Sequence, residues 1–326
     1  MILRFAFSIS LIVVGMTTGY AIRRASVAGR FGLPADLKPV RVRLQRIALL
    51  GLNPIAFIGA MWVAPLDNVR VVALPFVGLF ALTLGGALAA LAAKAFGLTR
   101  PQRGTYIVSG GFTNIGSVGA LLVFVLLGEA AFAFVPVYKL FEEILYYAVG
   151  FPLARAHSPK SQPGQTLSAR IGGVLKDPFV VVTLLSITTG LVLNFSGARR
   201  PDWYATVNAI VVPVVSFLLL LSIGMGLRFD LSRRYLKYSA GIVAIKHAVV
   251  PLCVTTVAWL VGLGTLAGGL PLQVILILSS MPVGFIAMVP PTLYELDVDL
   301  ANSNWIASNL VLLVLIPVLG SIVTMF

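Results

Sequence analysis

The sequence predicts an all-α integral membrane protein with ten transmembrane helices, arranged as two inverted repeats of five helices each. The first observation is composition, because 59% of the 326 residues are hydrophobic, only 11% are charged and the mean hydropathy is +0.99. Such values exclude a set of soluble domains. The second observation is a series of ten apolar stretches of about 20 residues, the length that crosses about 30 Å of hydrocarbon. The third is an internal repeat.

The ten apolar stretches divide evenly between the two halves of the chain. They cover residues 4–22, 46–65, 70–96, 103–128 and 131–154, and then 176–196, 204–227, 237–263, 271–294 and 301–326. Residues 1–154 are therefore predicted to form the first repeat and residues 176–326 the second. The polar, proline- and glycine-containing residues 155–175 are predicted to form a cytoplasmic linker.

The repeat is visible in a short motif and in the prolines that follow it. Thr17-Thr18-Gly19 in the first span recurs as Thr188-Thr189-Gly190 in the sixth. The prolines pair at similar offsets, Pro75 with Pro251, Pro101 with Pro271 and Pro152 with Pro317. Because each half has an odd number of spans, the second half must be inverted, which is the plan of many secondary transporters. The substrate site is then expected where the repeats cross.

The basic residues indicate the orientation of the chain in the membrane. Of the 24 Lys and Arg residues, 18 lie in the loops between spans 1 and 2, 3 and 4, 5 and 6, and 7 and 8, whereas only Arg4, Arg70, Arg199 and Arg200 lie on the other side. The positive-inside rule makes the basic side cytoplasmic. We therefore expect a multi-pass protein of the cell (inner) membrane with both termini on the non-cytoplasmic side. The lipid bilayer accounts for the net charge of +13, and no nucleic-acid partner is expected.

The fourth and ninth spans contain residues that interrupt helices. Residues 109–119 read SGGFTNIGSVG and residues 279–284 read SSMPVG, followed by Pro290-Pro291. In a helix interior, glycine costs about 1 kcal/mol and proline about 3 kcal/mol relative to alanine. Broken helices occur at membrane depth only where they are buried in protein or line a wet cavity. We expect helices 4 and 9 to be discontinuous and to cross, with their helix ends and free backbone groups forming an ion or substrate site. The alternative is that the glycines only permit close helix packing.

These motifs resemble a known family. Phe112-x-Asn114-x-Gly116-x-x-Gly119, together with Met281-Pro282 and Lys246 five residues before Pro251, resembles the auxin efflux carrier family, which includes malate-permease-like bacterial proteins. The likeness extends more weakly to the bile acid sodium symporters. One departure is Ala120-Leu121-Leu122, where the family usually has a proline after the glycines.

The resemblance implies a scaffold domain (spans 1, 2, 6 and 7), a transport domain (spans 3–5 and 8–10) and elevator-type alternating access. It also implies that Asn114 contacts a substrate carboxylate. The predicted substrate site comprises Ser109, Thr113, Asn114, Gly116, Met281, Pro282 and Gly284.

Charged residues inside the spans are candidates for ion coupling. Lys139, Glu142 and Glu143 share one helical face of the fifth span and should face the protein interior or water. A Lys139–Glu143 ion pair would leave a second carboxylate, which could bind Na⁺ or carry a proton.

Two further spans add candidates. Lys246 could neutralise a glutamate, attract an anionic substrate or snorkel to the cytoplasmic surface. His247 could titrate near neutral pH or serve as a hydrogen-bonded structural residue. Asn309 in the tenth span could reach the crossover or bond a neighbouring helix.

Together these features predict a secondary transporter of small organic anions, that is carboxylates, and leave a symporter coupled to Na⁺, one coupled to H⁺ and uncoupled transport open. The alternative is a cation/proton antiporter of similar inverted-repeat architecture that uses Glu142 and Glu143. No nucleotide-binding or catalytic signature is present, so no enzyme activity, cofactor or metal site is expected. A homodimer is compatible with the sequence.

Overall fold

A computed structural model describes residues 2–64, 68–159, 176, 178–227 and 233–323. In these ranges the chain is helical and contains no strand beyond one isolated bridge. Seven helices of the described residues are long and apolar enough to cross a membrane: Ala6–Val27, Lys38–Trp62, Val69–Ala95, Pro178–Phe195, Trp203–Gly224, Arg233–Leu260 and Val298–Val323. Ile115–Leu127 and Leu266–Ser279 are shorter apolar helices. The prediction of an all-α, multi-pass membrane protein is confirmed. Most of the predicted linker, residues 160–175, lies outside the described residues.

Contacts between residues divide the chain into two compact units, each assembled from three segments of sequence. Unit 1 comprises Met1–Pro65, Gly116–Pro136 and Val181–Arg228. Unit 2 comprises Leu66–Ile115, Val137–Val180 and Phe229–Phe326. The fourth predicted span is therefore shared, because its first part belongs to unit 2 and its second part to unit 1.

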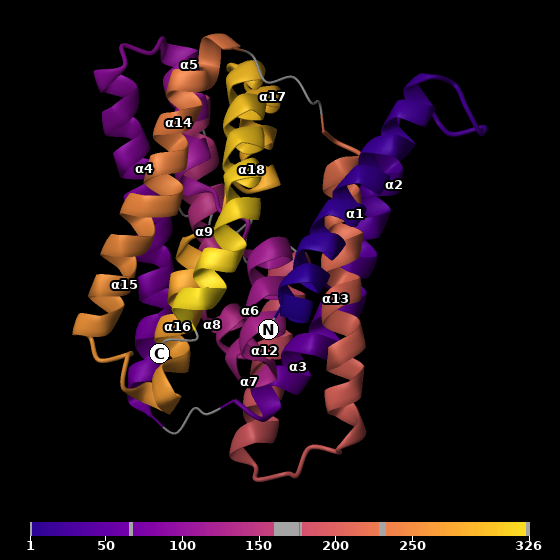
Figure 1. The fold of residues 1–326 in the computed structure, drawn as a ribbon, viewed down its shortest axis with the longest axis vertical. Helices are drawn as coiled ribbons and strands as arrows, with labels where there is room; N and C mark the ends of the chain where they lie inside the picture. The colour runs from indigo at the N-terminus through magenta and orange to yellow at the C-terminus, as the bar shows by residue number, and fades with distance from the viewer. Residues whose placement is uncertain (1, 65–67, 160–175, 177, 228–232, 324–326) are drawn as a thin grey trace. The chain divides into compact units, whose positions relative to one another are not determined.

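Unit 1 is built from long helices that lie side by side, with α1 against α13 (Figure 1). Its elements are α1 (Ile2–Val27), α2 (Lys38–Arg46), η1 (Ile47–Leu52), α3 (Asn53–Trp62), η3 (Ile115–Gly119), α6 (Ala120–Leu127), α7 (Glu129–Phe132), α8 (Phe134–Tyr138), α12 (Pro178–Phe195) and α13 (Trp203–Gly224). Ile115 of η3, the last two residues of α8 and the first three residues of α12 fall in unit 2.

Small residues bring the backbones of α1 and α13 into contact. A Cβ atom on Gly19 would lie 2.2 Å from the carbonyl oxygen of Leu221, and one on Gly224 would lie 2.3 Å from that of Met16. Glycine at such positions allows the close helix approach on which packing in membranes depends. Gly19 of the repeated Thr-Thr-Gly motif thus lies in a helix–helix contact.

Unit 2 contains the remaining elements. They are η2 (Val69–Ala73), α4 (Leu74–Ala95), α5 (Arg100–Gly111), α9 (Glu142–Leu145), η4 (Tyr146–Gly150), α10 (Phe151–Ala156), η5 (Arg233–Tyr235), α14 (Leu236–Ala244), η6 (Ile245–Val249), α15 (Val250–Leu260), η7 (Leu266–Gly269), α16 (Leu270–Ser279), η8 (Phe285–Met288), α17 (Val289–Leu293) and α18 (Val298–Val323). Within this unit α4 packs against α5, and α15 against α16.

Prolines explain where several helices widen. The π-helical segments η1, η4 and η6 each end two residues before a proline, namely Pro54, Pro152 and Pro251. A proline ring clashes with the carbonyl group four residues earlier and offers that group no N–H donor. In each segment that carbonyl lies inside the wider π turn, which relieves the clash. The segment η6 therefore sets the direction of its two polar residues, Lys246 and His247.

The fifth predicted span differs from the single helix that the sequence predicts. It is divided into α7, α8, a turn at residues 139–141, α9, η4 and α10. Pro136 accounts for the first interruption, because α7 ends at Phe132, four residues before it. The turn places Lys139 immediately before the short helix that carries Glu142 and Glu143.

Candidate functional site

The two interrupted spans meet through their backbones inside unit 2. The helix α5 ends at Gly111, and the chain is extended at residues 112–114 before it turns again. The helix α16 ends at Ser279, and η8 begins only at Phe285. Thr113 and Val283, one from each break, form an antiparallel bridge.

Two hydrogen bonds join the breaks. The amide N–H of Asn114 donates to the carbonyl oxygen of Pro282 at 3.0 Å, and that of Gly284 donates to the carbonyl oxygen of Phe112 at 3.0 Å. Unpaired backbone groups cost several kcal/mol at membrane depth. The two breaks therefore satisfy each other, which is why the chain tolerates both.

Gly284 has a steric role at this meeting point. A Cβ atom there would lie 2.9 Å from the carbonyl oxygen of Thr113 and 3.0 Å from its carbonyl carbon. The neighbouring Met281, Pro282 and Val283 are all buried. Five of the predicted substrate-site residues thus lie together: Thr113, Asn114, Met281, Pro282 and Gly284.

The other two predicted substrate-site residues lie nearby in sequence but have different surroundings. Ser109 is fully buried on α5, where its hydroxyl group donates to the carbonyl oxygen of Thr105 and accepts from Asn304 Nδ2 at 3.1 Å. Gly116 is half-buried in the π turn η3, which follows the break. Ser109 is thus engaged in packing α5 against α18.

Lys246 reaches the break of the fourth span from η6. Its ammonium group donates to the hydroxyl oxygen of Thr113 and lies 3.5 Å from the carbonyl oxygen of Gly110. Only 2% of the residue is exposed. The carboxylate of Glu142 also interacts electrostatically with Lys246. The described part of the site therefore holds a buried ammonium group that is bonded to a hydroxyl oxygen and a main-chain oxygen.

A tyrosine connects the same break to Glu142. Tyr146 accepts a hydrogen bond from the amide N–H of Thr113 at 2.8 Å and donates one to Glu142 Oε1 at 3.0 Å. Its ring stacks on Phe112 with the ring centroids 4.1 Å apart. Glu142 is 5% exposed and forms an ion pair with Lys139 Nζ at 3.0 Å. The sequence did not single out Tyr146, because a tyrosine in an apolar span carries no distinctive pattern.

Two candidate coupling residues, His247 and Asn309, lie at the break of the ninth span. The ring of His247 places Nδ1 2.9 Å from the carbonyl oxygen of Ser280 and Nε2 3.0 Å from that of Ser308. The Ser308 hydroxyl group accepts from the amide N–H of Val283 at 3.1 Å. Asn309 Nδ2 donates to the carbonyl oxygen of Trp305, in its own helix, at 2.8 Å. It also lies 3.5 Å from the carbonyl oxygen of Val283.

Glu143 shares the short helix α9 with Glu142 and is half-buried. Lys139 forms an ion pair with Glu142, three residues away, and interacts electrostatically with Glu143 as well. Since Glu142 is held by both Lys139 and Tyr146, its carboxylate is already compensated. The role of Glu143 in ion coupling stays a prediction.

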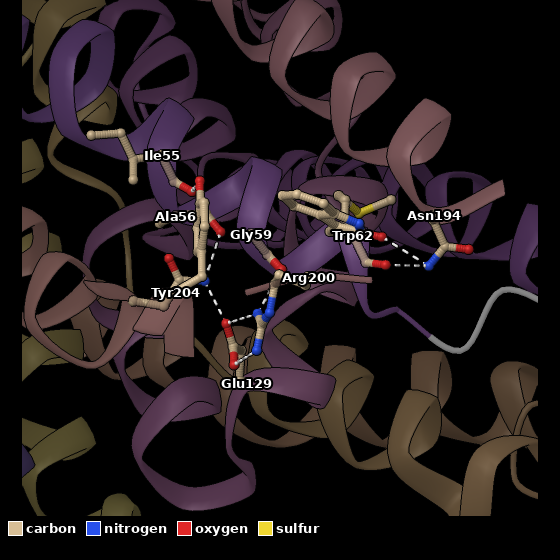
Figure 2. A network of polar contacts seen from close by, with 10 residues as sticks. Ile55, Ala56, Gly59, Trp62, Glu129, Asn194, Arg200 and Tyr204 are labelled. Carbon is tan, nitrogen blue, oxygen red and sulfur yellow. Dashed lines mark hydrogen bonds and ion pairs between the residues drawn. The ribbon is translucent and has the colours of Figure 1, made fainter. Parts of the chain in front are cut away.

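A second polar cluster lies in unit 1 (Figure 2). Glu129 forms a bidentate ion pair with Arg200, with oxygen–nitrogen distances of 2.5 and 2.9 Å. Asn208 Nδ2 donates to the same carboxylate, and Arg200 also donates to the carbonyl oxygen of Gly59 at 2.8 Å.

The same network caps a neighbouring helix. Asn194 Nδ2 lies within hydrogen-bond distance of the carbonyl groups of Met61, Trp62 and Ala64 at the end of α3. The cluster therefore fastens α3, α7 and the connection between α12 and α13 to one another. The sequence did not predict it, because 71 residues separate Glu129 from Arg200.

The polar side chains at the two breaks are an ammonium group, an amide, an imidazole ring, a carboxylate and several hydroxyl groups. The sequence matches no protein-family model, and a search of curated proteins finds no significant match.

Proposed function

We propose that this protein is a secondary transporter of small organic anions, in particular carboxylates. The observation that carries the proposal is Lys246, an ammonium group buried within a membrane-spanning helix and placed against the break of the fourth span. A buried charge is costly, and ionisable residues inside a membrane most often mark a substrate or ion pathway. A bound carboxylate would add negative charge beside this ammonium group.

Asn114 would give the site its preference for a carboxylate. It is 7% exposed and lies in the extended segment between α5 and η3. An amide N–H group can donate to a carboxylate oxygen while Lys246 supplies the charge, and charge-assisted hydrogen bonds are the strong ones. Thr113, Met281, Pro282 and Gly284 would form the surrounding wall.

The proposed mode of transport is alternating access of the elevator type, with ten spans in two inverted repeats. Two observations support it. The meeting residues 112–114 and 281–284 all belong to unit 2, so one unit could carry the whole site. Pro101 and Pro271, a predicted repeat pair, both stand in the first turn of the helix before a break, α5 and α16. Both termini and the loop after α12 would lie on the non-cytoplasmic side.

The contacts of Glu142 weigh against the alternative of a cation/proton antiporter. An antiporter needs a carboxylate that exchanges Na⁺ and H⁺, whereas Glu142 is bonded to both Lys139 and Tyr146. The break itself adds a lysine and an asparagine, which suit an anion better than a cation. The coupling ion, Na⁺ or H⁺, belongs to the proposal.

Transport by the purified protein in proteoliposomes tests the function. Uptake and electrogenic current are measured for a panel of mono- and dicarboxylates under Na⁺ gradients and pH jumps. Asn114→Ala and Lys246→Gln should each raise the half-saturating concentration at least about tenfold, because a lost charge-assisted hydrogen bond costs about 1.5–3 kcal/mol. Na⁺/H⁺ exchange without flux of any carboxylate would overturn the proposal.

A matched asparagine serves as the control. Asn68 lies at the start of η2 and accepts a hydrogen bond from the amide N–H of Arg70 at 2.9 Å. Asn68→Ala removes an amide from the same unit but away from the break. It should leave the half-saturating concentration unchanged, provided that both variants elute as folded protein in size-exclusion chromatography.

A further inference from the structure

The ring of His247 lies between two hydrogen-bond acceptors. Its Nδ1 atom is 2.9 Å from the carbonyl oxygen of Ser280, and its Nε2 atom is 3.0 Å from that of Ser308. A carbonyl oxygen only accepts hydrogen bonds, and a neutral imidazole ring has only one N–H group. Both contacts can be hydrogen bonds only when both nitrogen atoms carry a proton.

The two carbonyl groups stand on either side of the break in the ninth span. Ser280 follows the last residue of α16, where carbonyl groups have no partner within the helix. Ser308 belongs to α18, and its hydroxyl group holds the amide N–H of Val283 at the other end of the break. His247 and Ser308 together therefore fix residues 280–283 to η6 and α18.

We propose that His247 is a proton-binding site built into the break of the ninth span. With two protons the ring joins Ser280 to Ser308, and the loss of one proton releases one of these two hydrogen bonds. The inference deepens the proposed function, on which it rests for its link to transport, because it names H⁺ as the ion to which the site responds. The protonation of the ring itself can be tested without transport.

The charged groups around the ring determine what compensates its charge. The elements packed against η6 are α4, α14, α15 and α18, and α16 supplies the contact through Ser280. The charged residues on these elements and beside the ring are Lys94 of α4, Lys237 of α14, Asp299 of α18, and Lys246; α15 and α16 carry none.

Distance weakens the effect of most of these charges. Lys237 is ten residues from His247, or about 15 Å along a helix, and Asp299 is nine residues from Ser308, or about 13 Å. Lys94 lies at the end of α4, nine residues beyond Gly85, whose neighbours include Val250. Lys246 is the adjacent residue, so its charge opposes a second positive charge on the ring.

This opposition links the proton to the anion. A carboxylate bound at Lys246 would offset the ammonium charge and so favour the doubly protonated ring. By linkage, protonation of His247 must favour binding of the carboxylate to the same extent. The expected transport cycle is therefore symport, in which the anion and H⁺ move together.

Nitrogen NMR of the imidazole ring tests the protonation directly. The chain has two histidines, and His157 lies outside the site, where its Nδ1 atom is 2.8 Å from the carbonyl oxygen of Leu153. In His157→Gln protein labelled with ¹⁵N-histidine, the remaining signals belong to His247. We expect two protonated nitrogen atoms at mildly acidic pH and one at alkaline pH. A single neutral tautomer over the whole range would overturn the proposal.

Transport in proteoliposomes tests the coupling. His247→Gln should still take up carboxylate but lose most of the stimulation by an inward pH gradient, whereas His157→Gln should keep it. Equal stimulation in His247→Gln and the unchanged protein would overturn the coupling. If the unchanged protein moves no carboxylate at all, the proposed function fails, while the NMR titration still decides whether His247 binds a second proton.

Discussion

At the residue scale, Gly284 shows how little space separates the two broken spans. A Cβ atom at this position would lie 2.9 Å from the carbonyl oxygen of Thr113. Gly284→Ala should therefore lower the free energy of unfolding by about 1–3 kcal/mol, the usual cost of overpacking. A fluorescence-monitored denaturant titration in detergent measures the change.

Gly51 provides the matched control for this substitution. It also lies within a membrane-spanning helix, but a Cβ atom there would meet nothing within 4 Å. Gly51→Ala should leave stability unchanged or raise it by up to about 1 kcal/mol, because alanine favours helix. An equal decrease in the free energy of unfolding of the two variants would contradict the close approach at Gly284.

Tyr146 carries a second prediction at this scale. Its hydroxyl group bonds both the amide N–H of Thr113 and the carboxylate of Glu142. Tyr146→Phe leaves a buried donor without its partner, which costs about 1–3 kcal/mol, and should also reduce carboxylate uptake. Tyr204→Phe is the control, because Tyr204 donates to the carbonyl oxygen of Ile55 at an exposed position in unit 1. A loss of stability in Tyr204→Phe as large as that in Tyr146→Phe would argue against a special role.

The sequence allowed part of this site to be predicted. Asn114, Pro282 and Gly284 stand out because amides, prolines and glycines are costly inside an apolar helix. Tyr146 and Ser308 do not stand out, since a tyrosine or serine fits a membrane helix without breaking it. Their importance arises from partners that only the folded chain brings near.

At the scale of elements, the Glu129–Arg200 pair joins α7 to the connection between α12 and α13. Its side chains are 18% and 12% exposed, whereas the nearby Arg199–Asp202 pair is 89% and 92% exposed. Glu129→Gln should cost about 3 kcal/mol, because it leaves a largely buried guanidinium group without its counter-ion. Asp202→Asn should cost less than about 1 kcal/mol. Thermal unfolding of the two variants compares them, and equal shifts would contradict the assigned role of burial.

The helix breaks could be located from sequence more readily than the helix widenings. Runs of glycine or proline marked the ends of α5 and α16, but Pro54, Pro152 and Pro251 were compatible with a kink, a break or a π turn. The structure adopts the π turn in all three. The fifth span was harder still, because its division depends on Pro136 and on a turn with no glycine or proline of its own.

At the scale of the whole molecule, the basic loops predict an orientation that accessible cysteines can test. Ala28 and Ser196 are exposed at the ends of α1 and α12. In a Cys253→Ala background, Ser196→Cys should react with a membrane-impermeant maleimide in intact spheroplasts. Ala28→Cys should react only after the membrane is permeabilised. The reverse pattern would place the termini in the cytoplasm.

The membrane class of the whole chain followed from its hydropathy alone, since burial in lipid requires long apolar helices. The division into units did not. Hydropathy does not distinguish a helix that packs in one unit from a helix that packs in the other. The assignment of Gly116–Pro136 to unit 1 depends on contacts such as that of Glu129 with Arg200, which are distant in sequence.

The separation of Glu129 from Arg200 has a consequence for biosynthesis. Ribosomes make the chain from its N-terminus, and domains generally fold as their residues emerge. When Glu129 leaves the ribosome, its counter-ion lies 71 residues further along the message. The bare carboxylate is costly in hydrocarbon, so we infer that α7 remains at the aqueous surface of the membrane during this interval. The synthesis of Arg200 then permits the burial of Glu129. Unit 1 is complete at residue 228, before the rest of the 326-residue chain has been translated.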